Sequence, residues 1–499
     1  MRSPAKTSDI MKSYYLGIDI GSTAVKAMLI DGETLTPAFR AGVGYPTKRV
    51  GGYVTQAPSD WSDAAASAVR SVIAEADNAG RSGNILGISL SAQGGSIFAA
   101  DENHKPISDA VSWMDGRAAE EARELQSSFG EGVYLSSGWR LSPLDDASKL
   151  LWLKKNDSAL FRRAALYLTT ADYYTGHLCG RYVYDPASAA ITRLYDFMRG
   201  EYSRGLLEYL DIDAKKISPV MPSGALAGTL TKDAADELGL IPGIPVYVGA
   251  HDQYCAAVGS GIRRPGHLLI ATGTAWVLFG VTCEPCFSPL HTAPCVFPEL
   301  SGGDAKKYGV IATLSGIGAS VERFAASCGY SLAESDRLAA ALLEERPGVG
   351  RYVPASPCEE GRGFLPHRTG TGITYDPVSG EDYAARYLTL LEGAAFEALA
   401  AAEKLPLGAH PSVVMSGGAA RSALWRGIVA SAAASRGMTL ELAREKDAPA
   451  FGAALIAAAG AGRDIMSAVG KAEIVQPDVE YAARLGEAYM LWKKAILSE

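Results

Sequence analysis

The chain has 499 residues, of which 48% are hydrophobic and 8% aromatic, and it contains 54 glycines and 25 prolines. This composition is typical of a globular enzyme with many turns, and the length exceeds what one hydrophobic core usually supports, so we expect two domains. The net charge of −8 is mild, and the absence of a dense Lys/Arg stripe in the sequence argues against a nucleic-acid partner.

The sequence does not predict a membrane span. Its longest apolar stretch, residues 448–462, is rich in alanine, interrupted by glycine and shorter than the roughly 20 residues that a bilayer requires. The polar residues 1–12 do not resemble a signal peptide, and seven scattered cysteines fit reduced thiols better than a disulfide framework. We therefore expect a cytoplasmic protein without a membrane partner, and formation of a homodimer stays open.

The N-terminal half opens with an alternating strand at residues 14–20, a break at Gly21-Ser22-Thr23, and a second apolar strand at residues 25–30. This pattern predicts a β-hairpin. Strand-like and helix-like segments then alternate, which predicts a mixed α/β domain. The strand-like segments are residues 85–90 and 246–248, and the helix-like segments are residues 118–127 and 147–155.

The second half repeats this opening. A strand at residues 267–271 is followed by Thr272-Gly273-Thr274 and by another apolar strand at residues 276–281. Gly21 and Gly273 are 252 positions apart (273 − 21), close to half the chain. The repeat predicts two domains built on one plan, at residues 12–260 and 261–499.

Two further glycine and cap signals occur late in the chain. A strand at residues 413–415 ends at Ser416-Gly417-Gly418-Ala419 and precedes a predicted helix at residues 424–435. Asp447, with Pro449 in the first turn, is the predicted N-cap of a small-residue helix that runs through Ala459.

Three glycine turns therefore follow apolar strands, at residues 21–23, 272–274 and 417–419. Glycine permits a close approach of backbone N–H groups and small hydroxyls add donors, so such turns suit phosphate oxygens, although tight turns use the same residues for steric reasons. The P-loop and dinucleotide-binding patterns are absent from the sequence. Two turns, one from each half, would then grip a triphosphate across an interdomain cleft.

Asp252 follows the strand at residues 246–248 and precedes the apolar run at residues 254–258. A carboxylate at the end of a strand can act as general base toward a hydroxyl group. The same position suits a helix N-cap, so the residue pattern alone leaves both roles open.

Taken in order, these segments resemble the FGGY family of carbohydrate kinases over nearly the whole chain. Residues 16–26, LGIDIGSTAVK, resemble the first phosphate motif of the family, and residues 272–274 resemble the second. Residues 248–253, VGAHDQ, match the place of the catalytic aspartate, and residues 416–422, SGGAARS, resemble the adenosine-binding turn. The resemblance implies an α/β fold with two duplicated actin-like, ribonuclease H-like ATPase domains and an interdomain cleft.

The resemblance also implies roles for single residues, with Asp252 as the catalytic base. SAQGG at residues 91–95 and SWMDGR at residues 112–117 are similar to sugar-site segments. The implied sugar contacts are Gln93, Gly94, Trp113, Asp115, Asp252 and Gln253. The implied contacts to ATP are Asp19, Gly21, Ser22, Thr23, Lys26, Thr272, Gly273, Thr274, Gly316, Gly417, Gly418, Ala419 and Ser422, and Mg²⁺ is expected at Asp19 and Asp252 through water. Trp113 could equally be a core residue, and Arg117 could pair with Asp115 in a structural salt bridge.

The expected reaction is ATP-dependent phosphorylation of a ketose such as xylulose or a related pentulose. Gly94-Gly95 stands where D-xylulose kinases usually carry Met-His and glycerol kinases carry Arg-Glu, so another polyol or a heptulose stays open as the substrate. A rival within the same fold is an actin-like or Hsp70-like ATPase switch without sugar turnover. A rival from another class is a binding protein that senses a sugar or a metal.

A cysteine-rich segment raises the question of a metal site. Cys283, Cys286, His291 and Cys295 are spaced one residue short of a zinc knuckle. The three prolines in the segment and the lack of flanking basic residues in the sequence favour an ordinary loop over a zinc site.

Overall fold

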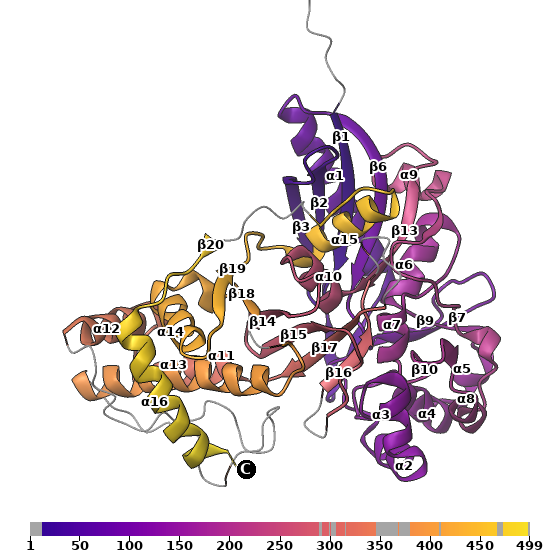
Figure 1. Ribbon diagram of the computed structural model, residues 1–499. Helices are drawn as coiled ribbons and strands as arrows, with labels where there is room; N and C mark the ends of the chain where they lie inside the picture. Colours follow the sequence, from indigo (N-terminus) through magenta and orange to yellow (C-terminus); the bar gives the residue numbers. More distant parts are fainter. Residues whose placement is uncertain are drawn as a thin grey trace, which may run out of the picture. The chain divides into compact units, whose positions relative to one another are not determined.

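The computed structural model describes residues 12–288, 292–298, 300, 306–314, 316–345, 368, 380–408, 411–466 and 473–497. They form a mixed α/β structure that divides into two compact units (Figure 1). Unit 1 comprises Met1–Gly259, Pro298–Asp304 and Asp447–Gly470, and unit 2 comprises Ser260–Phe297, Ala305–Lys446 and Lys471–Glu499. In contrast to the two contiguous halves that the sequence predicts, unit 1 therefore takes in a segment from the C-terminal part of the chain.

The larger sheet of unit 1 has the strand order β12-β13-β6-β1-β2-β3. Its strands are β1 (Lys12–Ile20), β2 (Ala24–Asp31), β3 (Pro37–Gly44), β6 (Gly83–Ala92), β12 (Leu226–Thr229) and β13 (Pro245–His251). β1 and β2 form the predicted antiparallel hairpin, and β6 pairs in parallel with both β1 and β13. The register pairs Asp19 with Ser91 and Ser91 with Ala250, so the carboxyl ends of the three parallel strands lie at one edge of the sheet.

Apolar side chains of these strands and of the helices against them form the core of unit 1. The helices are α1 (Pro58–Asn78), α6 (Thr170–Cys179) and α9 (Lys232–Leu238). α1 contributes Trp61, Val69 and Val72 at helical spacing, and all three are fully buried. Burial of each such side chain stabilises the fold by about 1.5–3 kcal/mol.

Helices α10 (Asp252–Gly259) and α15 (Ala448–Gly460) pack against each other, and α15 also packs on β1 and β6. Glycines allow their backbones to approach closely. A Cβ atom on Gly17 would lie 2.0 Å from the Ala450 carbonyl oxygen, and one on Gly452 would lie 1.9 Å from that of Cys255. This close packing is the reason that residues 447–470 belong to unit 1.

Unit 1 also contains a smaller sheet with the strand order β4-β5-β8-β7-β9 and a β10–β11 hairpin. These strands are β4 (Lys48–Val50), β5 (Tyr53–Gln56), β7 (Ile97–Ala100), β8 (Ala110–Val111), β9 (Leu166–Thr169), β10 (Tyr195–Asp196) and β11 (Glu201–Tyr202). The remaining helices of the unit are α2 (Ala119–Phe129), α3 (Glu131–Ser137), α4 (Asp146–Asn156), α5 (Ser158–Arg163), α7 (Pro186–Ile191), α8 (Arg204–Leu210) and the 3₁₀ turn η1 (Ala214–Lys216).

The sheet of unit 2 has the strand order β16-β17-β15-β14-β18-β19-β20. Its strands are β14 (His267–Thr272), β15 (Trp276–Thr282), β16 (Thr292–Val296), β17 (Tyr308–Thr313), β18 (Ser412–Gly417), β19 (Thr439–Leu442) and β20 (Glu473–Ile474). β14 and β15 form an antiparallel hairpin, and β14 runs parallel to β18. This arrangement repeats the β1–β2 hairpin beside β6, as the duplicated sequence pattern predicts.

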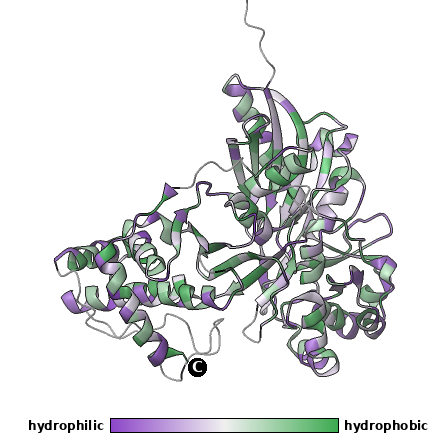
Figure 2. Ribbon diagram, viewed as in Figure 1, coloured by the Kyte–Doolittle hydropathy of each residue, from purple (hydrophilic) through white to green (hydrophobic). Residues whose placement is uncertain are grey.

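The helices of unit 2 are α11 (Ile317–Ser327), α12 (Leu332–Glu345), α13 (Gly380–Glu403), the 3₁₀ turn η2 (Ala419–Arg421), α14 (Ala423–Ala434) and α16 (Val479–Ile496). Their buried side chains join those of the strands in one core. Figure 2 shows hydrophobic and hydrophilic residues side by side along these helices, which is typical of helices with one buried face. Across the described ranges, every helix is too short or too polar to cross a bilayer.

Candidate functional site

The β1–β2 turn at residues 21–23 is partly exposed and is held in place by side chains from other segments. Gln56 Nε2 donates to the Ser22 carbonyl at 2.8 Å, and the Tyr45 hydroxyl donates to the Gly21 carbonyl. The turn is therefore fixed from behind while its residues keep contact with solvent. Sequence reasoning missed Tyr45 and Gln56, because neither lies in a recognisable motif.

Asp19, the last acidic residue of β1, lies buried beneath this turn with 5% exposure. Its Oδ1 accepts a hydrogen bond of 2.7 Å from the Ser91 hydroxyl. Burial raises the pKa of Asp19 to about 7, and the charge of Asp252 adds to this rise, while the Ser91 bond and the charge of Lys26 act against it. Asp19 and Asp252 are thus close enough to interact electrostatically.

Asp252 is the first residue of α10 and directly follows β13. Its side chain is 26% exposed, and its Oδ1 lies 3.2 Å from Nε2 of His251. The register of the parallel strands brings this carboxylate to the sheet edge that also carries Gln93 and the turn at residues 21–23. Gln253 follows in α10 and is partly buried.

Lys26 and Asp447 form an ion pair in which Nζ lies 2.9 Å from Oδ1. Arg40 Nη1 lies 3.8 Å from Oδ2 of the same carboxylate. Asp447 holds the N-cap position of α15, but its side chain makes no capping hydrogen bond. The predicted capping role of this side chain is therefore wrong, because the carboxylate pairs with cations on β2 and β3 instead.

Trp113 and Gln93, two predicted sugar contacts, lie near the turn at residues 21–23. Trp113 is 40% exposed, and its Nε1 donates to the Ser22 hydroxyl at 2.9 Å, so it is not a core residue. Gln93 is buried, its Nε2 donates to Gln56 Oε1 at 2.8 Å, and its own Oε1 has no hydrogen-bond partner among the described residues. A Cβ on Gly94 would lie 2.6 Å from Ile191 Cδ1, so this position has no room for a side chain unless Ile191 moves.

Asp115 differs from these residues because it is fully buried. Its carboxylate accepts hydrogen bonds from the Arg117 guanidinium at 2.8 and 2.7 Å and from the backbone of Val54 and Arg117. Burial acts to raise the pKa of Asp115, but these bonds outweigh it and lower the pKa. The Arg117 guanidinium also lies over the Tyr53 ring, 4.1 Å from its centroid. These contacts give Asp115 a supporting position behind Trp113.

In unit 2, the turns at residues 272–274 and 417–419 lie side by side. Gly418 N donates to the Thr272 carbonyl at 2.8 Å, and Ala419 N donates to the Thr272 hydroxyl at 3.2 Å. Gly417 has a φ of +95°, and a Cβ there would lie 2.5 Å from the Thr272 carbonyl oxygen, so only glycine fits without displacement.

The start of α11 meets the same turns. Gly316 directly precedes the helix, and Ala319 N donates to the Thr274 carbonyl at 3.1 Å. A Cβ on Gly318 would lie 2.2 Å from the Gly273 carbonyl oxygen. Ser422 caps α14, because its hydroxyl accepts a hydrogen bond of 3.3 Å from Trp425 N. The structure thus brings the predicted nucleotide residues of unit 2 together.

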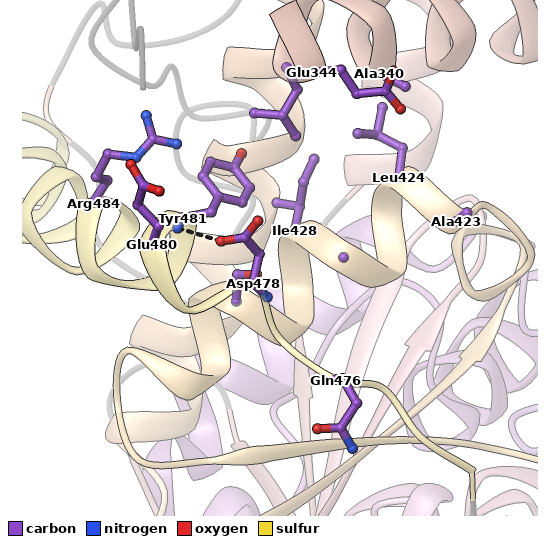
Figure 3. Close-up of a pocket in the computed structure, with 13 residues that line it drawn as sticks. Ala340, Glu344, Ala423, Leu424, Ile428, Gln476, Asp478, Glu480, Tyr481 and Arg484 are labelled. Atoms are coloured by element: carbon purple, nitrogen blue, oxygen red, sulfur yellow. Dashed lines mark hydrogen bonds between the residues drawn. The ribbon is translucent and has the colours of Figure 1, made fainter. Parts of the chain in front are cut away.

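A cavity of about 560 Å³ lies in unit 2 between α12, α14 and the start of α16. Figure 3 shows Leu424 and Ile428 of α14 facing Tyr481 and Asp478 at the N-terminus of α16. The lining residues of α14 begin at Ala423, and the lining contains none of the predicted nucleotide residues. This cavity is therefore distinct from the glycine turns.

Within the described ranges, no group of three or more His, Cys, Asp or Glu side chains has the arrangement of a metal site. Of the cysteine-rich segment, Cys283 is exposed, Cys286 is partly buried and Cys295 is buried, whereas His291 lies outside the described residues.

Comparison with known proteins assigns both halves of the chain to the same family. The N-terminal domain of the FGGY family of carbohydrate kinases matches residues 14–259, and the C-terminal domain matches residues 268–461. The xylulose kinase of Bacillus subtilis is 28% identical over 266 residues, which are 53% of this chain and 53% of that protein. The autoinducer-2 kinase of Yersinia enterocolitica is 27% identical over 427 residues, which are 80% of this chain and 78% of that protein. The chain spans about half the length of the xylulose kinase and more of the autoinducer-2 kinase.

Solved structures agree in fold. A xyloylose kinase from Brucella ovis has a TM-score of 0.83 at 25% identity, covering 96% of this chain and 98% of that one. The glycerol kinase of Plasmodium falciparum has a TM-score of 0.80 at 16% identity and covers 97% of this chain and 98% of that one. At this identity the match supports only the fold. The matched domains, the two sheet-rich α/β units and the shared fold together show that the protein belongs to the FGGY family of carbohydrate kinases.

Proposed function

We propose that the protein transfers the γ-phosphoryl group of ATP to a hydroxyl group of a ketose such as xylulose or a related pentulose, with Asp252 as general base. The main support for this proposal is the position of Asp252. Its carboxylate is partly exposed, directly follows β13, and lies at the same edge of the sheet as Gln93 and the turn at residues 21–23. A general base must stand within hydrogen-bond reach of the hydroxyl that it deprotonates.

The acceptor sugar would be held by residues of unit 1. Trp113 offers an exposed aromatic face beside Ser22, and the unpartnered Oε1 of Gln93 can accept a hydrogen bond from a sugar hydroxyl. Gln253 adds donors and acceptors next to Asp252. Ile191 and His251 fill the space that a side chain at Gly94 would need, so Gly94 would contact the sugar through its backbone groups alone. We propose that Asp115 supports the Trp113 segment without touching the sugar.

The nucleotide would be held by backbone N–H groups and small hydroxyls of the glycine turns. In unit 1, Lys26 carries positive charge near the turn at residues 21–23. In unit 2, residues 272–274 and 417–419 form adjoining turns, with Gly316 and Ser422 at the starts of two helices. Their backbone groups suit the phosphates and the nucleoside of ATP.

The residues of unit 1 fit a hydrated Mg²⁺ ion. Asp19 and Asp252 are two interacting carboxylates: burial raises the pKa of Asp19, the charge of Asp252 adds to the rise, and a cation between them would favour the ionised form. Mg²⁺ keeps several waters and is usually bound by one or two carboxylates together with substrate phosphates. When bound, the ion supplies positive charge to the phosphate oxygens.

In the proposed reaction, Asp252 accepts the proton of the sugar hydroxyl as its oxygen forms the bond to the γ-phosphorus. The bond from phosphorus to the β,γ-bridging oxygen breaks, and ADP leaves. Positioning and electrostatic stabilisation supply most of the rate in phosphoryl transfer, so the fixed turn at residues 21–23 and Lys26 support the step that Asp252 initiates.

One observation favours a second substrate. The autoinducer-2 kinase matches 80% of this chain, whereas the xylulose kinase matches 53%. Autoinducer-2 is therefore the alternative acceptor, and Gly94 is compatible with either, since no side chain at this position selects between them.

An ADP-release assay with a panel of acceptors tests the proposal. We expect ADP to form only when an acceptor is present, with pentuloses or autoinducer-2 giving the highest kcat/KM in a panel that also contains hexuloses, heptuloses and alditols. ADP release at the same rate with and without every acceptor would contradict the proposal and favour an ATPase switch.

A further inference from the structure

Lys149 of α4 is a buried lysine that the proposed reaction does not use. Its side chain is only 1% exposed, although α4 also carries Lys154 and Lys155 nearer the surface. Removing an ammonium group from water costs several kcal/mol, so a buried lysine requires partners that offset this loss. The identity of those partners indicates what the residue does.

The short hydrogen bond of Lys149 is directed to a backbone carbonyl. Nζ donates to the Gly95 oxygen at 2.7 Å, whereas Oδ1 of Asp146 lies 3.9 Å away, beyond hydrogen-bond range. Neither carboxylate oxygen of the fully buried Asp146 has a hydrogen-bond partner in the described part of the chain. A lysine that served only to neutralise Asp146 would bond to that carboxylate instead.

Gly95 belongs to the turn that carries the predicted acceptor residues. It has a φ of +70°, which favours glycine, and a Cβ there would lie 3.2 Å from the Cβ of Trp113. A Cβ on the neighbouring Gly94 would lie 3.0 Å from the His251 ring, next to Asp252. The turn whose carbonyl Lys149 holds thus packs closely against Trp113 and His251.

The first turn of α4, from which the Lys149 side chain extends, is held in place by hydrogen bonds. Asp145 caps α4, because its Oδ1 accepts a hydrogen bond from Ser148 N at 2.7 Å, and its Oδ2 accepts one from Ser142 N at 2.6 Å. Ala147 N donates to the Thr192 carbonyl at 3.1 Å. The first turn of α4 is therefore anchored on both sides, and Lys149 extends from it to the Gly95 carbonyl.

We propose that Lys149 is a positioning residue of the acceptor site, which holds the Gly95 carbonyl and thereby fixes the turn at residues 93–96 against Trp113. This inference rests on the proposed acceptor role of Gln93 and Trp113. The opposing explanation is that Lys149 only balances the charge of Asp146.

Three variants separate these explanations: Lys149→Met, Asp146→Asn, and the two substitutions combined. Lys149→Met alone removes one of the two cations that act on Asp146 and leaves Arg193 as the other, so it destabilises the protein under either explanation. The double variant removes both charges. If the lysine only balances charge, the double variant regains wild-type behaviour; if it holds the turn, the double variant folds stably but the turn stays loose.

Amide hydrogen exchange of the protein without substrate measures how stably the turn at residues 93–96 is held. We expect the amides of residues 93–96 to exchange at least about tenfold faster in the double variant than in wild type, because a hydrogen bond to a charged group is lost. The strands β1 and β13 should exchange as in wild type. Wild-type exchange of the turn in the double variant would overturn the proposal.

Kinetics with the best acceptor from the ADP-release panel complete the test. In the double variant we expect the acceptor KM to rise about tenfold or more, with the ATP KM changed less than about twofold. Faster exchange with an unchanged acceptor KM would also overturn the proposal. If wild type releases no ADP with any acceptor, the proposed function fails and this inference falls with it, whereas the exchange result still reports on the turn.

Two further variants complete the design. Lys154→Met is the matched control, because Lys154 of the same helix also donates to a backbone carbonyl, that of Tyr209 at 3.3 Å, but near the surface; we expect wild-type exchange and KM. Lys149→Arg should regain part of the acceptor affinity, since a cavity of about 170 Å³ borders Lys149 and offers room for the larger guanidinium. If Lys149→Arg raises the acceptor KM as much as Lys149→Met does, the proposed role of the hydrogen bond to the Gly95 carbonyl is contradicted.

Discussion

The β1–β2 turn of unit 1 and the β14–β15 turn of unit 2 have the same backbone plan but different surroundings. In unit 1, the charged side chains of Asp19, Lys26 and Asp447 interact around the turn. In unit 2, residues 416–419 and 318–319 contact the turn; they are uncharged and approach it through backbone atoms.

This difference indicates a division of labour on a duplicated scaffold. Charged groups can take protons and balance phosphate charge, so we propose that the reacting groups belong to unit 1. Closely packed backbone offers N–H donors and leaves no space for larger side chains, so we propose that the main contribution of unit 2 is to nucleotide binding. Substitutions should therefore affect turnover in unit 1 and fold or ATP affinity in unit 2.

The largest effect is expected for Asp252→Asn in unit 1. The amide cannot accept the sugar proton, so kcat should fall by about 10²–10⁴-fold, the range for loss of a general base. ATP affinity measured by calorimetry should stay within about threefold of wild type. Asp109→Asn, which removes a surface carboxylate 2.9 Å from Lys48, is the control and should leave kcat unchanged. Near-normal turnover of Asp252→Asn would show that Asp252 is not the general base.

A pH experiment examines whether charges in unit 2 are structural. Burial raises the pKa of Glu392 in α13 to about 7, although its Oε1 accepts a hydrogen bond of 2.7 Å from the Tyr481 hydroxyl. The folded pKa is above the unfolded value, so the carboxyl group contributes stability at pH 4 and this contribution is lost as the pH rises to 7. The loss amounts to roughly 3 kcal/mol.

Glu392→Gln keeps the acceptor oxygen and removes the titration. We expect the free energy of unfolding of wild type, relative to the variant, to decrease between pH 4 and pH 8 in urea denaturation. Equal pH dependence of the two proteins would show that Glu392 titrates normally in unit 2, and kcat of the variant at pH 7.5 should equal that of wild type.

Gly417→Ala tests the backbone approach in unit 2. The left-handed backbone alone costs about 1–2 kcal/mol with a side chain present, and the new Cβ would also contact the Thr272 carbonyl. We expect a lower unfolding midpoint and a higher ATP KM, with the acceptor KM unchanged. Gly427→Ala is the control: it lies inside α14 with open space around it, so alanine should stabilise the helix slightly. A harmless Gly417→Ala would weaken the contrast between the units.

The smallest effect is expected for the ion pair of unit 1. Lys26→Gln leaves Asp447 beside Asp19 without its nearest cation, so kcat/KM should fall about tenfold, which is about 1.4 kcal/mol. Arg40→Gln removes the cation at 3.8 Å and should cost less than about threefold. If Asp447→Asn combined with Lys26→Gln shows no coupling in a double-mutant cycle, the pair has no part in catalysis.

The sequence predicted the local structure well and the long-range contacts poorly. Apolar alternation located β1, β2, β14 and β15 to within about two residues, because each hairpin is determined by its own turn and side-chain period. The small-residue helix α15 was also expected, but its membership of unit 1 was not, since helix periodicity does not reveal which sheet a helix packs on.

The same limit applies to the candidate site. The glycine turns and Asp252 belong to recognisable motifs, whereas Tyr45, Gln56 and Lys149 act through hydrogen bonds to carbonyls that are distant in the sequence. Such bonds are determined by tertiary packing and have no local pattern. Asp447 shows the opposite problem, because a good N-cap signal predicted a local role for a side chain that pairs across the fold.

The position of α15 has a consequence for how the protein forms during synthesis. The sheet of unit 1 is complete once residue 251 has left the ribosome, yet the helix that covers β1 and β6 is made about 200 residues later. During that interval Gly17 and Gly259, whose backbones α15 contacts, remain uncovered. The sheet of unit 1 is therefore covered by α15 only after residue 460 has been made, and a chain released before that point would leave this face of the sheet exposed.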